Sequence, residues 1–173
     1  MAASPDYRKV KREVKRLLDK YVTDAPPVDP KEIAQKLGIN VKFVSFNEAL
    51  SDKISGFYDI DSNTIFVNEE EYPLRQTFTI AHELGHALLH KDWSGSESYK
   101  VMLRKTRYDP DPYEKEANAF AANLLVPRSL LAKYLSLPVH KLSAIFAVSV
   151  PVIKNRLCFE YGIDIEDACG SNS

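Results

Sequence analysis

The amino-acid sequence predicts an α+β fold, in which a small, mostly antiparallel three-stranded sheet packs on a pair of long helices and is followed by a C-terminal helical bundle. Three observations support this fold. Three short segments within residues 40–67 are rich in β-branched and aromatic residues, two longer segments repeat apolar residues at helical spacing, and prolines divide the last third into short helices. The chain has 173 residues, 45% of them hydrophobic and 27% charged, which is typical of one globular domain.

Residues 1–24 are expected to contain a basic helix. Its apolar residues recur along one helical stripe, at Val10, Val14, Leu17, Leu18 and Tyr21. Lysines and arginines occupy most of the remaining positions. We interpret them as a solvated face rather than a patch for nucleic acid or lipid, because the formal net charge of −1 gives no overall attraction to either partner.

The next expected element is a short helix over residues 30–37. Asp29 is placed to cap it, Pro30 suits its first position, and Gly38 is a stop signal. A strand is then expected over residues 40–46, where apolar and polar residues alternate.

Two β-prone runs, residues 54–58 and 64–67, are separated by the turn-forming sequence DIDSN. They predict a hairpin, and with the preceding strand a sheet of three strands.

The stretch FTIAHELGHALLH, Phe78–His90, places three histidines and a glutamate in a helix expected to begin at Pro73. His82 and His86 are roughly 6 Å apart along the axis, which lets two imidazoles converge on one cation. Glu83 points about 100° away, where it is a poor third ligand but reaches a water on the metal. His-Glu-x-x-His is the signature of zinc proteases for this reason.

A solvent-facing pair is the alternative interpretation of His82 and His86. It is disfavoured because Phe78 and Leu89 flank the polar face and partly enclose it. His90 lies about 12 Å along the axis from His82, too far for both to bind one ion. We therefore expect His90 to interact with the negative end of the helix dipole.

A third ligand is expected from a helix between Pro112 and Pro127. Glu114 lies about 50° from the centre of its apolar stripe and Glu116 about 110°, so Glu114 is the carboxylate that needs a buried partner. The alternative is that Glu114 only charges the first turn. Asn118, one turn later, is expected to orient a ligating histidine or the carboxylate.

The two motifs FTIAHELGHALLH and EKEANAFAANLLVP resemble the ImmA/IrrE family of metallopeptidases, which are small intracellular zincins. The similarity extends upstream to VDPKEIAQKLGINVKFVSF and ISGFYD, so it covers most of residues 25–160. The sequence LLVP departs from the usual LLMP of the family, which leaves the resemblance intact.

This resemblance implies that His82, His86 and Glu114 bind zinc, with manganese as the alternative ion. It also implies that Glu83 is the catalytic acid and base and that Asn118 supports the site. The implied activity is endopeptidase cleavage of a specific protein, a helix-turn-helix transcriptional repressor, in the cytoplasm.

The implied organisation is one zincin-like domain. Its parts are a basic N-terminal helix in residues 1–24, a metallopeptidase core in residues 25–126, a C-terminal helical subdomain in residues 127–163, and a tail in residues 164–173.

A substrate site is expected beside the cleft on the strand that contains Ser55, Gly56 and Phe57. An extended peptide could add to the edge of this strand through main-chain hydrogen bonds. The stretch 91–112 has no sustained period and is expected to be a long surface loop or lid.

Tyr99, Tyr108 and His140 have the chemistry to stabilise an oxyanion, but no motif places them near the site.

Two other functions compete with proteolysis. The C-terminal helices have a helix-turn-helix pattern with Lys154, Asn155 and Arg156 on the second helix, which is an alternative indication of DNA binding. Core packing explains the apolar residues there equally well, so nucleic acid is not the expected partner. The second alternative is a regulator or anti-repressor that holds metal and a repressor without hydrolysis.

The remaining expectations concern the compartment. The start of the sequence lacks the apolar region of a signal peptide, and no run reaches the length of a membrane span, so we expect a cytoplasmic protein without a membrane partner. Cys158 and Cys169 have no CxxC spacing and no neighbouring histidine, so free thiols are expected.

Overall fold

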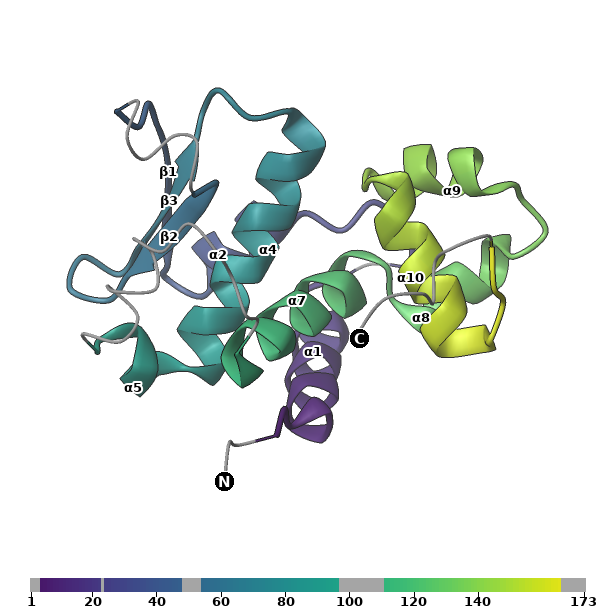
Figure 1. The fold of residues 1–173 in the computed structure, drawn as a ribbon, viewed down its shortest axis with the longest axis horizontal. Coiled ribbons are helices and arrows are strands. Elements are labelled where there is room, and N and C mark those ends of the chain that lie inside the picture. Colours follow the sequence, from purple (N-terminus) through teal and green to yellow (C-terminus); the bar gives the residue numbers. More distant parts are fainter. Residues whose placement is uncertain (1–3, 23, 48–53, 97–110, 166–173) are drawn as a thin grey trace.

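The computed structural model describes residues 4–22, 24–47, 54–96 and 111–165. The sheet lies at one end, the helices α4 and α7 cross beside it, and the C-terminal helices cluster at the other end (Figure 1). The α+β class, the three strands and the C-terminal cluster of helices are confirmed. Within the predicted loop 91–112, residues 97–110 lie outside the described residues. This part of the chain includes Tyr99 and Tyr108.

Helix α1 (Tyr7–Tyr21) starts at Asp6, whose side chain accepts hydrogen bonds from the first backbone amides of the helix. The residues that it buries are Val10, Val14 and Leu17. All its basic residues except Lys9 are exposed, as a solvated face requires. Helix α2 (Pro30–Lys36) is capped by Asp29 in the same way.

The sheet consists of β1 (Asn40–Val44), β2 (Gly56–Asp59) and β3 (Thr64–Asn68) in the order β1-β3-β2. The predicted hairpin of β2 and β3 is antiparallel. Strand β1, however, pairs with β3 in parallel, so the sheet is mixed rather than mostly antiparallel. The alternation of side chains identifies a strand but carries no information on its direction, and here β3 inserts between its two predecessors.

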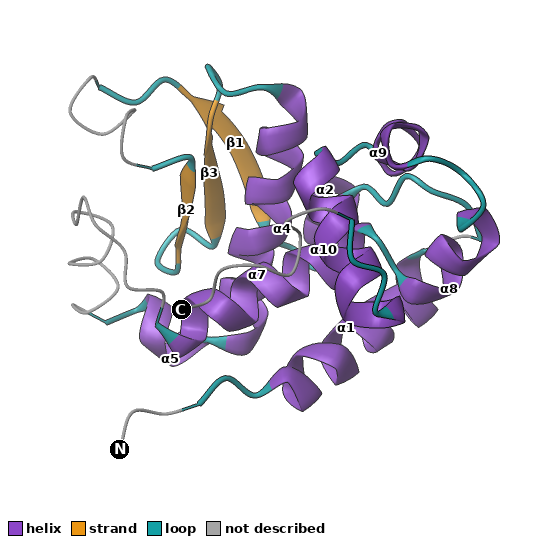
Figure 2. Ribbon diagram, turned by 45° about the vertical axis from the view of Figure 1, so that its right-hand side comes forward, coloured by secondary structure: helices purple, strands orange, loops and turns teal. Residues whose placement is uncertain are grey.

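One face of the sheet is covered by α4 (Pro73–Leu89) (Figure 2). The side chains of Tyr58, Ile65 and Val67 are buried in this layer. Gly56 permits the close packing, because a Cβ atom there would lie 2.5 Å from the carbonyl oxygen of Phe66 and 2.6 Å from a methyl carbon of Thr79.

Helix α4 also packs against α7 (Pro112–Leu125). The contact involves Gly85, where an added Cβ would lie 3.0–3.2 Å from the side chain of Phe120. The glycine inside the His-Glu-x-x-His motif therefore serves the approach of a second helix. Phe120 itself is fully buried.

The short helix α5 (Lys91–Ser94) follows α4 at the start of the predicted loop. After α7 come α8 (Arg128–Leu131), the 3-10 helix η1 (Ala132–Tyr134), α9 (Val139–Phe146) and α10 (Val150–Tyr161). Among the described residues no single helix is long and apolar enough to cross a membrane, although α9 and α10, bent by 106°, meet that test as a pair.

The expectation of free thiols is wrong for Cys158, which is disulfide-bonded on α10. Cys169 lies outside the described residues. The expectation rested on spacing along the chain, but a disulfide requires only that two Cβ atoms approach in space.

Candidate active site and metal centre

Helix α4 orients the first group of site residues through its buried stripe. Ile80, Ala81 and Leu84 are buried in the core, which leaves His82 and His86 facing α7. The His86 residue is only 1% exposed. An imidazole so deeply buried needs polar partners, and α7 supplies them.

Helix α7 supplies a carboxylate and an amide. Asp111 caps the helix by accepting a hydrogen bond from the backbone amide of Glu114 at 2.9 Å, which fixes Glu114 in the first turn. Glu114 is 7% exposed and Asn118 follows one turn later. The burial of Glu114 agrees with its predicted place beside the apolar stripe.

His82, His86 and Glu114 come together at one point. The two Nε2 atoms are 3.1 Å apart. Glu114 Oε1 is 2.9 Å from His86 Nε2, and Glu114 Oε2 is 3.3 Å from His82 Nε2. The ligand atoms of all three residues lie within 4.8 Å of one another.

This donor set fits a divalent cation. Two ligands held about 2.1 Å from a tetrahedral ion are about 3.4 Å apart, close to the separations found here. Glu114 Oε1 is buried without a hydrogen bond of acceptable geometry, although His86 Nε2 is near. Two acceptor atoms directed at a common point have this arrangement, and two imidazoles with a carboxylate suit zinc or another transition metal.

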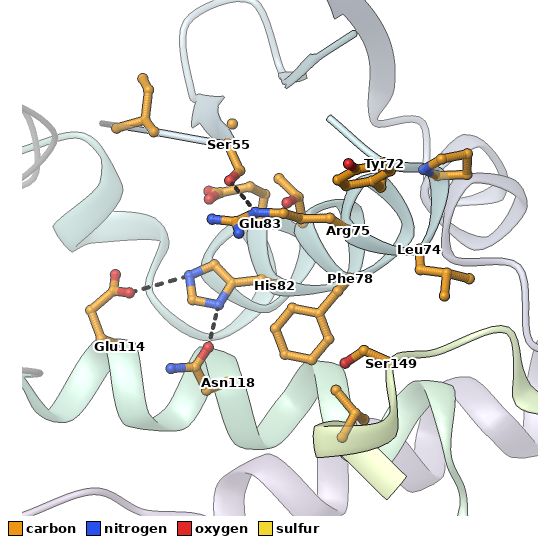
Figure 3. A pocket seen from close by; sticks show the side chains of 15 residues that line it. Ser55, Tyr72, Leu74, Arg75, Phe78, His82, Glu83, Glu114, Asn118 and Ser149 are labelled. Carbon is orange, nitrogen blue, oxygen red and sulfur yellow. Dashed lines mark hydrogen bonds and ion pairs between the residues drawn. The ribbon is translucent and has the colours of Figure 1, made fainter. Parts of the chain in front are cut away.

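Asn118 holds His82 from the other side. His82 Nδ1 is 3.0 Å from Asn118 Oδ1. An amide oxygen only accepts, so Nδ1 carries the proton and His82 Nε2 keeps its lone pair for a cation. Figure 3 shows the ring of His82 between Glu114 and Asn118. Of the two partners that the sequence allowed for Asn118, the structure selects the histidine.

His90 differs from the expectation of a helix-end histidine beside the dipole. It is buried, with Nε2 2.8 Å from Glu116 Oε2 and Nδ1 3.0 Å from Nδ1 of His86. Glu116 is also buried, at 6% exposure, because α1 covers it. A helical wheel of α7 alone does not show that α1 packs over Glu116. The one available signal was the i, i+4 spacing of His86 and His90.

Aromatic rings enclose this inner side of the site. The Trp93 and Tyr113 rings stack with centroids 4.8 Å apart. Trp93 lies 5.2 Å from the His86 ring, and Tyr113 lies 4.9 Å from the His90 ring. The opposite side of the site opens to a cleft.

Burial and charge shift the pKa values of these groups. Burial lowers the pKa of His86 to about 4, and it also lowers the pKa of His90. Burial opposes a charge on His82 as well, but the close contact with Glu114 and the charge of Glu83 raise its pKa. Burial would raise the pKa of the Glu114 carboxyl, yet the close contacts with the two imidazoles hold it well below its usual range. An ionised Glu114 and a neutral His86 are the forms that bind a cation.

The cleft has a volume of about 930 Å³. His82, Glu83 and Glu114 line one end of it. Apolar side chains of α4 and the start of α10 line the other end, where Figure 3 shows Leu74 and Phe78 near Ser149. The C-terminal helices thus form one wall of the cleft.

The predicted substrate strand borders the same cleft. Ser55 and Gly56 line it. Phe57 is not among the lining residues, because its ring stacks on Phe66 with a centroid distance of 5.1 Å and also approaches Phe46.

Strand β2 is an edge strand. The backbone amide of Asn68 donates to the carbonyl of Ser55, and the register pairs Phe57 with Phe66. In an antiparallel ladder, hydrogen-bonded pairs alternate, so the main-chain N–H and C=O groups of Gly56 point away from β3.

The helix-turn-helix pattern of α9 and α10 has an interhelical angle of 106°, within the range of that motif. Arg156, however, is 3% exposed and binds the carbonyl of Val126 and the carboxylate of Glu160. It is therefore not available to a phosphate. His140, on α9, is exposed and is not among the cleft-lining residues.

Comparisons with known proteins agree with this geometry. The chain is 36% identical over 130 residues to uncharacterized immunity region protein 2 of Bacillus phage phi105, covering 74% of this chain and 75% of that protein. It is 29% identical to the radiation response metalloprotease IrrE of Deinococcus radiodurans and 28% identical to that of Deinococcus deserti. These matches cover 72% and 70% of this chain but only 37% and 41% of those longer proteins.

The solved structure of a Mycobacterium tuberculosis transcriptional regulator shares the fold, with a TM-score of 0.62 and 19% identity over 87% of this chain and 46% of that one. The family described as Peptidase_M78, the IrrE N-terminal-like domain, matches residues 34–158. The chain therefore belongs to the IrrE N-terminal-like peptidase family, which confirms the resemblance to ImmA/IrrE metallopeptidases.

Proposed function

We propose that the protein is a zinc-dependent endopeptidase in which His82, His86 and Glu114 bind the metal and Glu83 is the general base. The observation that carries the proposal is the convergence of two Nε2 atoms and one carboxylate at the end of an open cleft that Glu83 also lines. Three protein ligands with an open position are typical of catalytic rather than structural zinc sites.

Each residue then has a defined task in hydrolysis. A bound ion would acidify a water molecule and polarise the scissile carbonyl. Glu83 accepts the proton that the water loses during attack and returns it to the amine leaving group. Asn118 keeps the His82 ring in place by accepting a hydrogen bond from Nδ1–H. The stacked rings of Trp93 and Tyr113 pack against His86 and His90 behind the ligands.

We propose a DNA-binding repressor of the helix-turn-helix class as the substrate. The name of the phage relative, an immunity region protein, supports a substrate among proteins that control phage immunity. Mapping of new protein N-termini in host cells that express wild type or Glu83→Gln tests the substrate class. A single new N-terminus within a DNA-binding regulator, absent with the variant, is the expected result; cleavage only of unrelated proteins would refute this substrate.

The edge of β2 is the proposed binding site for the substrate main chain. Substitution of Gly56 is a poor test, because any side chain there collides with Phe66 and Thr79. Peptide substrates with single amide-to-ester replacements leave the protein unchanged. The ester that removes the N–H group facing the carbonyl of Gly56 should lower kcat/KM about 2- to 10-fold, and esters at the two neighbouring positions should not. A uniform response along the peptide would contradict strand addition.

The apolar end of the cleft should select a bulky apolar side chain of the substrate. Leu74 lines the cleft, is 42% exposed and lies in the first turn of α4, where an acidic residue is tolerated. Leu74→Asp is therefore expected to lower kcat/KM about 10- to 100-fold without loss of stability.

Val150 gives a matched control for this prediction. It is 37% exposed in the first turn of α10 but is not among the cleft-lining residues. Steady-state kinetics of Val150→Asp should match wild type. Equal losses in both variants would mean that the apolar end of the cleft does not contact substrate.

A further inference from the structure

A continuous row of hydrogen bonds leads from the N-terminal helix to one of the candidate metal ligands. The backbone amide of Asp6 donates to Glu116 Oε1 at 2.7 Å. Glu116 Oε2 is 2.8 Å from His90 Nε2, and His90 Nδ1 is 3.0 Å from His86 Nδ1. The row spans α1, α7 and α4.

Only one placement of protons satisfies this row with neutral histidines. A carboxylate oxygen accepts hydrogen bonds, so His90 Nε2 carries a proton and donates a hydrogen bond to Glu116. The other nitrogen of a neutral His90 is then an acceptor, and the proton in the contact with His86 belongs to His86 Nδ1. His86 Nε2 is left with a lone pair directed toward Glu114 and His82.

The two histidine ligands are thus held by different means. Asn118 accepts directly from His82, whereas His86 is held through an intermediate ring whose own tautomer depends on a carboxylate. The side chains of His86 and His90 are each 1% exposed and that of Glu116 is 8% exposed, so bulk water does not compete for these contacts.

We propose that Glu116 and His90 are positioning residues that fix the proton of His86 on Nδ1 and so present Nε2 to the metal. The proposal rests on the proposed metal site but not on the identity of the substrate. Neither residue touches the reacting atoms. Their effect is on the affinity and geometry of the metal centre, as is usual for residues that orient a ligating histidine.

Glu116→Gln is the sharpest variant, because Asp6 restricts how the new amide binds. The N–H of Asp6 needs an acceptor, so the glutamine oxygen takes that place and its NH2 group faces His90 Nε2. His90 must then carry its proton on Nδ1 and donate a hydrogen bond to His86 Nδ1. The proton of His86 moves to Nε2, and metal affinity is expected to fall about 10- to 100-fold.

Two substitutions at His90 separate the effect of its hydrogen bonds from the effect of its size. In His90→Gln the new carbonyl can accept from His86 Nδ1 while the amide donates to Glu116, so most of the affinity should be retained. His90→Leu removes the acceptor and should bind metal about as weakly as Glu116→Gln. The exposed Glu32→Gln on α2 loses the same charge far from the site and should equal wild type.

Two measurements decide the proposal. Long-range proton–nitrogen NMR correlation of the metal-free protein, at about pH 8 and so above the lowered pKa values of His86 and His90, reads the tautomer of His86 directly. The chain has only four histidines to assign. Competition with a chromophoric chelator gives the zinc affinity.

The expected result is an Nδ1–H tautomer of His86 in wild type and an Nε2–H tautomer with weaker zinc binding in Glu116→Gln. An Nε2–H tautomer in wild type overturns the proposal even if no variant folds. Unchanged zinc affinity in a folded Glu116→Gln overturns it too. A protein with the expected tautomer and affinities that cleaves no peptide would refute the proposed peptidase function and leave these positioning roles intact.

Discussion

Glu83→Gln is expected to lower kcat for peptide hydrolysis by about 10²- to 10⁴-fold, which is the usual contribution of a general base. The variant should still bind zinc, because Glu83 is not among the three converging ligand residues. Glutamine has nearly the same shape as glutamate, so the 6% exposed side chain should keep its packing. Cleavage of a repressor of the proposed class, followed by gel electrophoresis and mass spectrometry, measures the effect.

The same variant separates hydrolysis from regulation by binding. Zinc content by plasma mass spectrometry serves as the control that the centre is intact. If the proposed repressor substrate is inactivated in cells that contain Glu83→Gln as in cells that contain wild type, the protein acts by binding and the general-base assignment is wrong. Loss of both cleavage and inactivation supports the peptidase.

Glu114→Ala is expected to weaken zinc binding by more than the roughly 10- to 100-fold typical of residues behind a ligand. The substitution removes one of three donors and also leaves two buried histidines without their carboxylate. In the metal-free protein it should also cost stability, since loss of one partner from a buried ionic contact typically costs about 3–5 kcal/mol. Equilibrium dialysis against zinc and urea unfolding measure the two effects.

Acid unfolding of the metal-free protein gives a second check on Glu114. Its lowered pKa in the folded state means that the folded form binds fewer protons, so its stabilising contribution is present above the unfolded pKa of about 4.5 and is lost as the pH falls below that value. Glu114→Ala should flatten this part of the curve. Zinc binding by the variant as tight as in wild type would remove Glu114 from the ligand set.

Helix positions were predictable because their signals are local. Asp29 and Asp111 cap the expected helices, and the i, i+4 spacing alone brings His82 and His86 together. Glu114 was predictable because its angle from an apolar stripe depends only on its own helix. The metal-binding roles of these residues stay predictions, but short-range periodicity shows on which face of its helix each residue lies.

Features that depend on three or more elements were not predictable in this way. The burial of Glu116 requires α1 to lie across α7, and the parallel pairing of β1 requires β3 to enter between two other strands. The surroundings of His90 differ from the prediction because a helical wheel of α4 does not show that Glu116, on α7, lies next to His90. Cys158 was misjudged for the same reason, since spacing along the chain does not report proximity.

The contact of Gly85 with Phe120 has a consequence for the choice of ion. His82 and His86 belong to α4 and Glu114 to α7, so the distance between the two helix axes sets the radius of the cavity that these residues form. The ring nitrogens disfavour calcium, which takes oxygen ligands, and zinc binds nitrogen at about 2.0–2.1 Å. A bulkier residue at position 85 should move Glu114 outward and weaken the binding of a small ion such as zinc, without any change in the ligands themselves.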